Sequence, residues 1–164
     1  LAGAPRCALI DAGERATLLA RLGPDPLRRE ADPDVAWRRL SVSKQPIAQL
    51  LMDQQVIAGI GNVYRAELLY RAGLSPYLPG STLSREQWQA LWKDTKRSMG
   101  AGLRANRIVT TLPSDRDHRS GRVRPTDAVY VYRRHGMPCR RCGTAVAIES
   151  LAGRWLYWCP TCQA

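Results

Sequence analysis

Four of the five cysteines in this 164-residue chain form two closely spaced pairs, Cys139 with Cys142 and Cys159 with Cys162. Two residues lie between the cysteines of each pair, and sixteen residues lie between the pairs. This spacing is typical of a structural zinc site, in which four thiolates fill the tetrahedron and leave no position for a reacting ligand. We therefore expect these four cysteines to bind one Zn²⁺ ion with a structural role.

Disulfide bonds and redox chemistry are the alternative uses of paired cysteines. Two disulfides would need an oxidising compartment, and the N-terminal residues lack the basic region followed by an apolar run that would direct export. A thioredoxin-like redox site normally has a single C-x-x-C motif near a βαβ unit. Zinc is therefore favoured over both. The fifth cysteine, Cys7, is interpreted as a small buried apolar side chain.

The segment between the cysteine pairs has the composition of a β-hairpin. Residues 145–148 (AVAI) and 155–158 (WLYW) are apolar or aromatic, and a stretch that contains polar residues and a glycine separates them. We expect two short strands between the cysteine turns, with Arg154 at the tip of the hairpin.

The chain carries a large excess of positive charge. Its 25 Lys and Arg residues against 14 Asp and Glu residues give a net charge of +11. This imbalance favours a polyanionic partner, with nucleic acid as the leading candidate and a merely basic soluble surface as the alternative. Membrane binding is not favoured, because no segment is both strongly amphipathic and densely basic, and no apolar run approaches the roughly 18 residues of a span.

Helical spacing of apolar residues dominates the chain before the cysteines. Ser43 is expected to cap one helix, Gly73 to end another, and Ser84 with Gln87 to form a capping box at the start of the clearest amphipathic helix. The pattern predicts helices over residues 11–22, 33–40, 43–53 and 62–71, and one that begins after Ser84. The fold class is therefore mainly α with a small β-hairpin zinc finger.

Residues 54–61 join two of these helices and contain two glycines, which favours a compact pair of turns. The unpaired N–H groups and positive dipole end of the helix that follows make an anion site. Asn62 could cap this helix and still offer its amide to a phosphate, while Gly61 would let the backbone approach a DNA strand closely. A simple turn with an Asn cap is the alternative interpretation.

Three segments resemble the formamidopyrimidine-DNA glycosylase and endonuclease VIII family. Residues 51–67 (LMDQQVIAGIGNVYRAE) followed by 72–76 (AGLSP) are similar to its helix-two-turn-helix motif. Residues 131–144 (VYRRHGMPCRRCGT) with 153–162 (GRWLYWCPTC) resemble its zinc finger, and 22–27 (LGPDPL) resembles the entry into its C-terminal domain.

The resemblance implies roles in binding DNA for five residues. Asn62 would hold a phosphate next to the damaged nucleotide, with Gly61 contributing backbone N–H, and Arg154 would grip phosphates on the other side of the lesion. Tyr132 lies where the family leads its chain into the finger, and core packing is its alternative role. Lys44 could reach a phosphate, although a solvated surface position is the simpler interpretation.

The same resemblance suggests four regions. Residues 1–12 would be the remnant of an upstream β domain, 13–104 a helical helix-two-turn-helix domain, 105–128 a mobile basic linker and 129–164 the zinc finger. Glu67 is expected to tether the motif internally rather than to contact DNA.

Catalysis in this family uses an N-terminal Pro amine, an adjacent Glu and a Lys on a β-sandwich domain. None of these is present in a chain that starts at Leu1, so we expect no catalytic residue here. The expected protein is a monomeric, cytoplasmic, nucleoid-associated binder of double-stranded DNA with a damaged base or abasic site, working with an N-terminal catalytic domain or chain. Residues 154–160 resemble the endonuclease VIII branch, which favours oxidised pyrimidines. A non-catalytic zinc ribbon that binds DNA or protein is the alternative.

Overall fold

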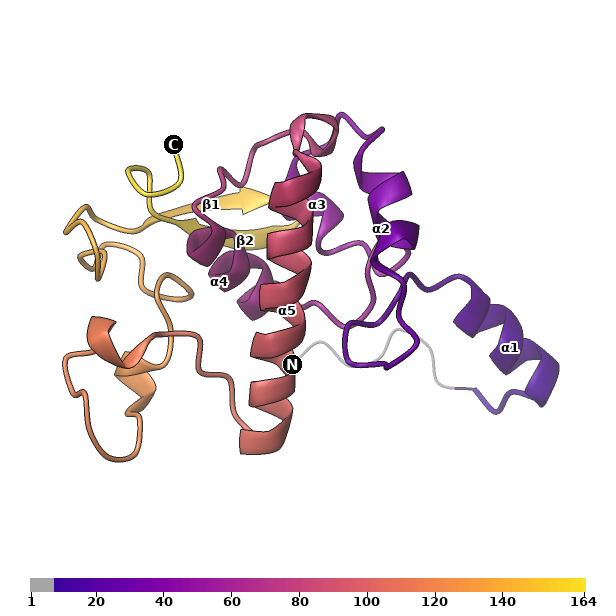
Figure 1. Cartoon of the computed structure of the whole chain (residues 1–164), viewed down its shortest axis with the longest axis horizontal. Coiled ribbons are helices and arrows are strands. Elements are labelled where there is room, and N and C mark those ends of the chain that lie inside the picture. The colour runs from indigo at the N-terminus through magenta and orange to yellow at the C-terminus, as the bar shows by residue number, and fades with distance from the viewer. Residues whose placement is uncertain (1–7) are drawn as a thin grey trace.

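The computed structural model describes residues 8–164 and confirms a mainly α fold with a C-terminal β-hairpin (Figure 1). Three short 3-10 helices, η1 to η3, accompany the regular elements. The elements in chain order are α1 Ala12–Ala20, α2 Pro33–Leu40, α3 Ile47–Leu50, α4 Asn62–Ala72, η1 Gly80–Thr82, α5 Arg85–Ala105, η2 Pro113–Asp115, η3 Pro125–Asp127, β1 Ala147–Leu151 and β2 Arg154–Trp158.

The main core lies where α4 packs between α5 and β2, with α2 and α3 closing its other side (Figure 1). Each fully buried large apolar side chain stabilises such a core by about 1.5–3 kcal/mol. Its largest buried apolar side chains are Trp88, Leu40, Ile47, Leu51, Ile57, Ile60, Leu68, Leu69 and Leu91, and Leu156 of the hairpin joins them. The hairpin is therefore part of the body and is not a detached module.

Helix α5 begins as the sequence predicts. The Ser84 hydroxyl accepts a hydrogen bond from Gln87 N (3.1 Å), and the Gln87 side chain accepts one from Ser84 N (2.8 Å). Arg71 at the end of α4 donates two hydrogen bonds to Asp94 of α5, at 2.7 and 2.8 Å. This bidentate pair fixes the two helices against each other.

The first helix of the double-turn motif is shorter than expected. The prediction of a helix over 43–53 capped by Ser43 is wrong, since α3 covers only Ile47–Leu50 and its N-cap is Pro46. The Ser43 hydroxyl instead accepts from Gln45 N (3.2 Å) in a local turn. The helix stops early because Asp53 accepts from Gln55 N (2.8 Å), a turn that competes with continued helix.

The hairpin has a tighter turn than the sequence suggested. Residues 145 and 146 pair with the entry to the first cysteine turn, so β1 begins at Ala147. Ala152 and Gly153 both adopt positive φ, 51° and 72°, as a two-residue hairpin turn requires. Arg154 therefore directly follows the turn and pairs with Leu151.

Glu67 in the middle of α4 is completely buried and holds three parts of the chain together. Its carboxylate accepts hydrogen bonds from the backbone N–H groups of Tyr130 (2.7 Å), Val131 (2.8 Å) and Tyr132 (2.8 Å). It also accepts one from the Thr110 hydroxyl. The structure thus shows Glu67 as an internal tether, the role expected from the sequence.

The segment expected to be a mobile linker, residues 105–128, is tied down at both ends. Thr110 N donates to Ala128 O (2.8 Å), and the Thr111 hydroxyl donates to Asp127 O (2.6 Å). Both threonines are buried, and Arg107 also reaches Val123 O (2.5 Å). The charged composition of this segment did not indicate that Thr110 and Thr111 would bind the backbone near its other end.

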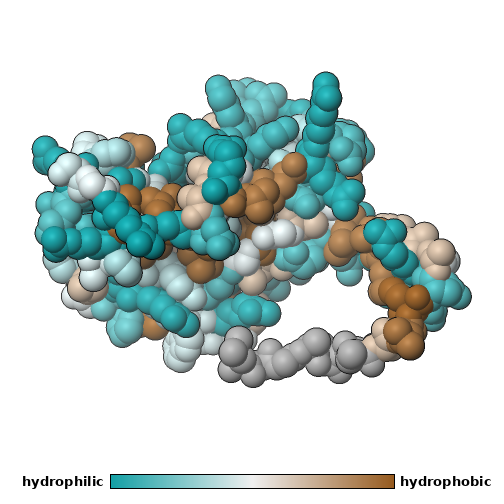
Figure 2. Space-filling view, turned by 90° about the horizontal axis from the view of Figure 1, so that it is seen from below, coloured by the Kyte–Doolittle hydropathy of each residue, from teal (hydrophilic) through white to brown (hydrophobic). Residues whose placement is uncertain are grey.

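Helix α1 projects away from the body and has no buried residue (Figure 1). Figure 2 shows apolar side chains gathered on this projecting arm. Residues 8–11 form no regular element, whereas most of the proposed β remnant, with Cys7, lies outside the described residues. Among residues 8–164, no helix is long and apolar enough to cross a membrane.

Substitution of Glu67 by Gln tests the tether. We expect Glu67→Gln to lower the free energy of unfolding by about 2–4 kcal/mol, because an amide turns donors toward backbone N–H groups and leaves buried groups unpaired. Urea denaturation followed by circular dichroism measures this. The control Glu30→Gln changes an exposed side chain, so its effect should stay within about 0.5 kcal/mol. Equal stabilities for the two variants would contradict the assigned role.

Candidate zinc centre and nucleic-acid interface

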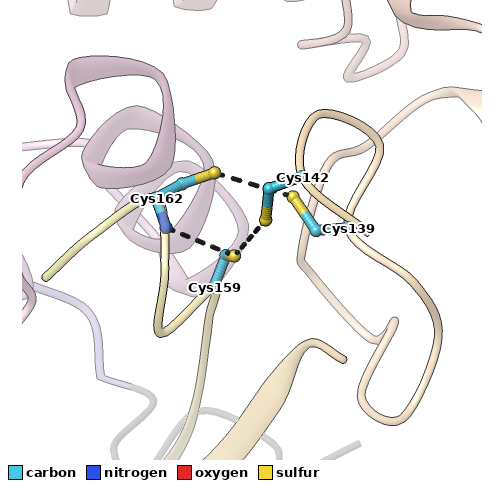
Figure 3. Close-up of side chains that lie close together, drawn as sticks. All are labelled: Cys139, Cys142, Cys159 and Cys162. Carbon is cyan, nitrogen blue, oxygen red and sulfur yellow. Dashed lines mark hydrogen bonds between the residues drawn. The ribbon is translucent and has the colours of Figure 1, made fainter. Parts of the chain in front are cut away.

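The four cysteines meet at one point between the two cysteine turns (Figure 3). All four sulfur atoms lie within 4.8 Å of one another; the Sγ atoms of Cys139 and Cys162 are 3.9 Å apart, and those of Cys142 and Cys159 are 3.4 Å apart. A tetrahedral zinc ion with Zn–S bonds of about 2.3 Å would separate its sulfurs by about 3.8 Å. The donor set therefore fits one structural Zn²⁺, as expected.

Local hydrogen bonds and burial act on the thiols in opposite directions. The side chain and backbone of Thr144 lower the pKa of Cys142 to about 6. Burial, followed by the neighbouring cysteines, raises the pKa of Cys162 to about 12. Four thiolates at this spacing repel one another, so a divalent cation at their centre is what allows all four to be charged.

The zinc site is joined to the helical body through α4. The hydroxyl of Tyr70, which is fully buried, lies 3.1 Å from Cys139 Sγ. Its ring stacks on Tyr130 at 4.7 Å, and the Arg141 guanidinium covers both rings. Burial raises the pKa of Tyr70 above its usual value, so this hydroxyl keeps its proton. The metal and the helix are thus held in a fixed relation.

The N-terminus of α4 is open as an anion site. Gly61 is its N-cap and no side chain caps it, so the N–H groups of the first turn keep no helical partner. A Cβ added to Gly61 would meet no atom within 4 Å, so this exposed backbone has free space above it. The expected cap by Asn62 is wrong, because Asn62 is already the first helical residue.

Asn62 instead connects α4 to the hairpin. Its amide nitrogen donates to Trp155 O (2.9 Å), and its amide oxygen accepts from Arg65. Arg65 donates to the same Trp155 carbonyl (2.9 Å). An Asn amide has two N–H groups, so one stays available for a ligand. Arg154 immediately precedes Trp155 in β2, so Asn62 and Arg154 lie on neighbouring elements.

Arg65 is a feature of this site that the sequence reasoning missed. It is buried, its Nε has no hydrogen-bond partner, and no Asp or Glu pairs with it among the described residues. Burial, and then the charge of Arg154, lower its pKa. The i, i+3 spacing from Asn62 was the available signal, since such residues share a helix face.

The other two expected contact residues differ in their surroundings. Lys44 is exposed and lies before α3 rather than inside a helix. Tyr132 is half-buried, with its N–H on Glu67 and its ring 5.3 Å from that of Tyr157. The ring of Tyr132 therefore packs against Tyr157, while part of the residue stays accessible to solvent.

Two family models match the chain. The formamidopyrimidine-DNA glycosylase H2TH domain matches residues 22–114, which is more than half of the chain, and the zinc finger found in FPG and IleRS matches residues 136–164. The first match includes the double-turn motif, and the second includes the cysteine site.

Curated relatives extend over nearly all of the chain. Endonuclease 8 1 of Mycobacterium tuberculosis (strain ATCC 25618 / H37Rv) is 47% identical over 164 residues, which cover 99% of this chain and 61% of that protein. Formamidopyrimidine-DNA glycosylase of Geobacillus kaustophilus is 36% identical over 151 residues, 92% of this chain and 54% of that protein. The chain thus spans little more than half of the length of these relatives.

Solved structures show the same architecture. MutM (Fpg) from Thermus thermophilus has a TM-score of 0.75 and 34% identity, covering 93% of this chain and 57% of that one. MutM in complex with DNA that contains carbocyclic 8-oxo-G has a TM-score of 0.74 and 25% identity, covering 92% of this chain and 54% of that one.

Fold and site together define a helix-two-turn-helix domain followed by a four-cysteine zinc finger. The chain belongs to the formamidopyrimidine-DNA glycosylase and endonuclease VIII family, the family that the sequence motifs resemble.

The zinc site predicts one metal ion per chain. We expect Cys159→Ser to abolish stoichiometric zinc and to lower the Tm, because Cys159 is fully buried between the hairpin and the Cys139 turn. Metal analysis and thermal unfolding measure both effects. Cys7→Ser is the matched control and should retain one zinc ion. Full zinc content in the Cys159 variant would contradict a four-thiolate site.

Proposed function

We propose that the chain binds double-stranded DNA at phosphates on both sides of a damaged nucleotide or abasic site. It would be the DNA-binding part of a base excision repair glycosylase and AP lyase. Asn62 and the backbone N–H groups after Gly61 would hold one phosphate, and Arg154 the phosphates across the lesion. Lys44 and Tyr132 would make flanking contacts. Such a grip suits an enzyme that extrudes its target nucleotide from the duplex, since the backbone must be held while the base leaves the stack.

The observation that carries this proposal is the unpaired positive charge at the α4 N-terminus. Arg65 is buried without an acidic partner among residues 8–164 and faces the charge of Arg154, which costs free energy in the isolated chain. The helix N-terminus adds further positive potential at the same place. A DNA phosphate would compensate the positive charge of Arg65, of Arg154 and of the helix N-terminus. A neutral or basic partner would compensate none of these.

The relatives support the same assignment and suggest a branch. The similar MutM structure contains DNA with carbocyclic 8-oxo-G, and the M. tuberculosis relative is named endonuclease 8. Its 47% identity, against 36% for the glycosylase of G. kaustophilus, favours the endonuclease VIII branch and therefore oxidised pyrimidines as lesions. Base removal and strand cleavage would be the work of an N-terminal catalytic domain or chain. A DNA repair role would place the protein on the nucleoid.

Substitutions at the two phosphate sites test this function. We expect Arg154→Ala and Asn62→Ala each to weaken binding to an abasic-site duplex about 10- to 100-fold, because each removes a charge-assisted hydrogen bond to phosphate. Fluorescence anisotropy with a labelled duplex measures the affinity. Trp155, which is 58% exposed beside Arg154, provides an intrinsic fluorescence signal for the same titration.

Zinc content and Tm must match the unmodified chain for these variants to be informative. Arg38→Gln, an exposed charge on α2, is the matched control and should bind within about twofold of the unmodified chain. Unchanged affinity in folded Arg154→Ala would contradict the proposal. Equal binding of intact and abasic duplexes by the unmodified chain would favour the second candidate, a non-catalytic zinc ribbon with ordinary salt-sensitive affinity.

A further inference from the structure

Five arginines surround the finger, and the structure separates them by what their guanidinium groups contact. Arg134 donates to Tyr130 O (2.6 Å) and Pro138 O (3.1 Å). Arg140 donates to Thr126 O (2.6 Å) and pairs with Asp127 (3.2 Å) and Asp117 (3.1 Å). The guanidinium of Arg141 covers two tyrosine rings and pairs with Asp115 (3.4 Å). These three arginines hold the finger and the preceding segment in place.

The remaining two, Arg133 and Arg154, are exposed. Within residues 8–164, neither guanidinium has a hydrogen bond or an ion pair. Arg154 already has a phosphate-binding role in the proposed function. Arg133 shares its exposure and its free charge, but no role has been derived for it.

The backbone at Arg133 is unusual for such a side chain. Its φ is +55°, in the left-handed region. Arg134 N donates to Val131 O (3.0 Å), which makes Arg133 the third residue of a four-residue turn. A turn with positive φ at only this position strongly favours glycine there.

The other two non-glycine residues with positive φ in the described part of the chain have local explanations. Asn106 ends α5, and Ala152 lies in the hairpin turn. Asn tolerates this conformation well, and the two-residue hairpin turn requires it. Only at Arg133 does a long charged side chain occupy a glycine position without such a reason. Strained backbone of this kind is concentrated at functional sites.

The Arg133 side chain lies beside Tyr132, one of the residues proposed to contact DNA. Its guanidinium lies over the Tyr132 ring, 5.4 Å from the ring centre. That ring meets Tyr157, which is three residues along β2 from Arg154. Side chains three residues apart on a strand point to opposite faces, so Tyr157 packs inward while Arg154 stays exposed. Glu67 fixes Tyr132 N, so the turn that carries Arg133 is anchored to α4.

We propose that Arg133 holds a further DNA phosphate, beside the flanking contact proposed for Tyr132. This inference rests on the proposed DNA-binding function and adds a contact to it. The Tyr132 ring would position the guanidinium, which leaves its outer N–H groups free for phosphate oxygens. The strained turn would be retained because it presents this charge.

The test is the salt dependence of DNA binding by Arg133→Gly. A phosphate contact contributes about 0.9 to the slope of log K against log salt for B-DNA, so the slope should become shallower by about 0.9. At low salt we expect about a tenfold loss of affinity. Glycine relieves the strain at φ +55°, so the Tm should rise by about 2–4 °C. A residue that only supports the fold would change the Tm and leave the slope unchanged.

Three further variants complete the experiment. Arg133→Lys keeps the charge and should preserve the slope. Asn106→Gly changes another left-handed position without removing a charge, and Arg38→Gln removes a distant exposed charge; neither should change the slope. An unchanged slope in Arg133→Gly overturns the inference, whatever happens to the Tm. Failure of the unmodified chain to bind DNA would instead overturn the proposed function.

Discussion

The buried carboxylate of Glu67 is the interaction on which the arrangement of the helical body and the zinc finger depends. A carboxylate with three backbone N–H donors and one hydroxyl donor is fully satisfied although no water reaches it. The donors come from Thr110 and from residues 130–132, which lie on either side of residues 111–129. One side chain of α4 therefore closes the 111–129 loop at its base and fixes where the zinc finger begins.

Helix α4 extends this control along its whole length. Its first turn binds the Trp155 carbonyl through Asn62 and Arg65, and its last turns reach Cys139 through Tyr70 and α5 through Arg71. The same rigid helix thus holds both the metal site and the hairpin tip in position. Binding groups that must grip two points of one DNA backbone need such a fixed separation, because a loose one would add an entropic cost to binding.

The sequence predicted the parts of this protein that local rules determine. Cysteine spacing specifies the zinc site, and the Ser84 capping box specifies the start of α5, because both depend on residues a few positions apart. The cap at Asn62 failed because its amide binds a carbonyl 93 residues away. The closed loop at Thr110 and the buried Arg65 were missed for the same reason: their partners, or lack of them, are set by tertiary contacts.

Arg65 and Arg133 each carry a physical cost. One is a buried charge without a counterion in the described part of the chain, and the other is a long side chain in a glycine conformation. Arg71 and Arg140, by contrast, have carboxylate partners. A preorganised anion site holds positive groups without a counterion, here at the hairpin and the α4 N-terminus. A phosphate can then supply the missing partner without rearrangement of the protein. The buried, unpaired Nε of Arg65 beside the N-terminus of α4 therefore identifies the proposed DNA-facing surface more specifically than the net charge of +11 does.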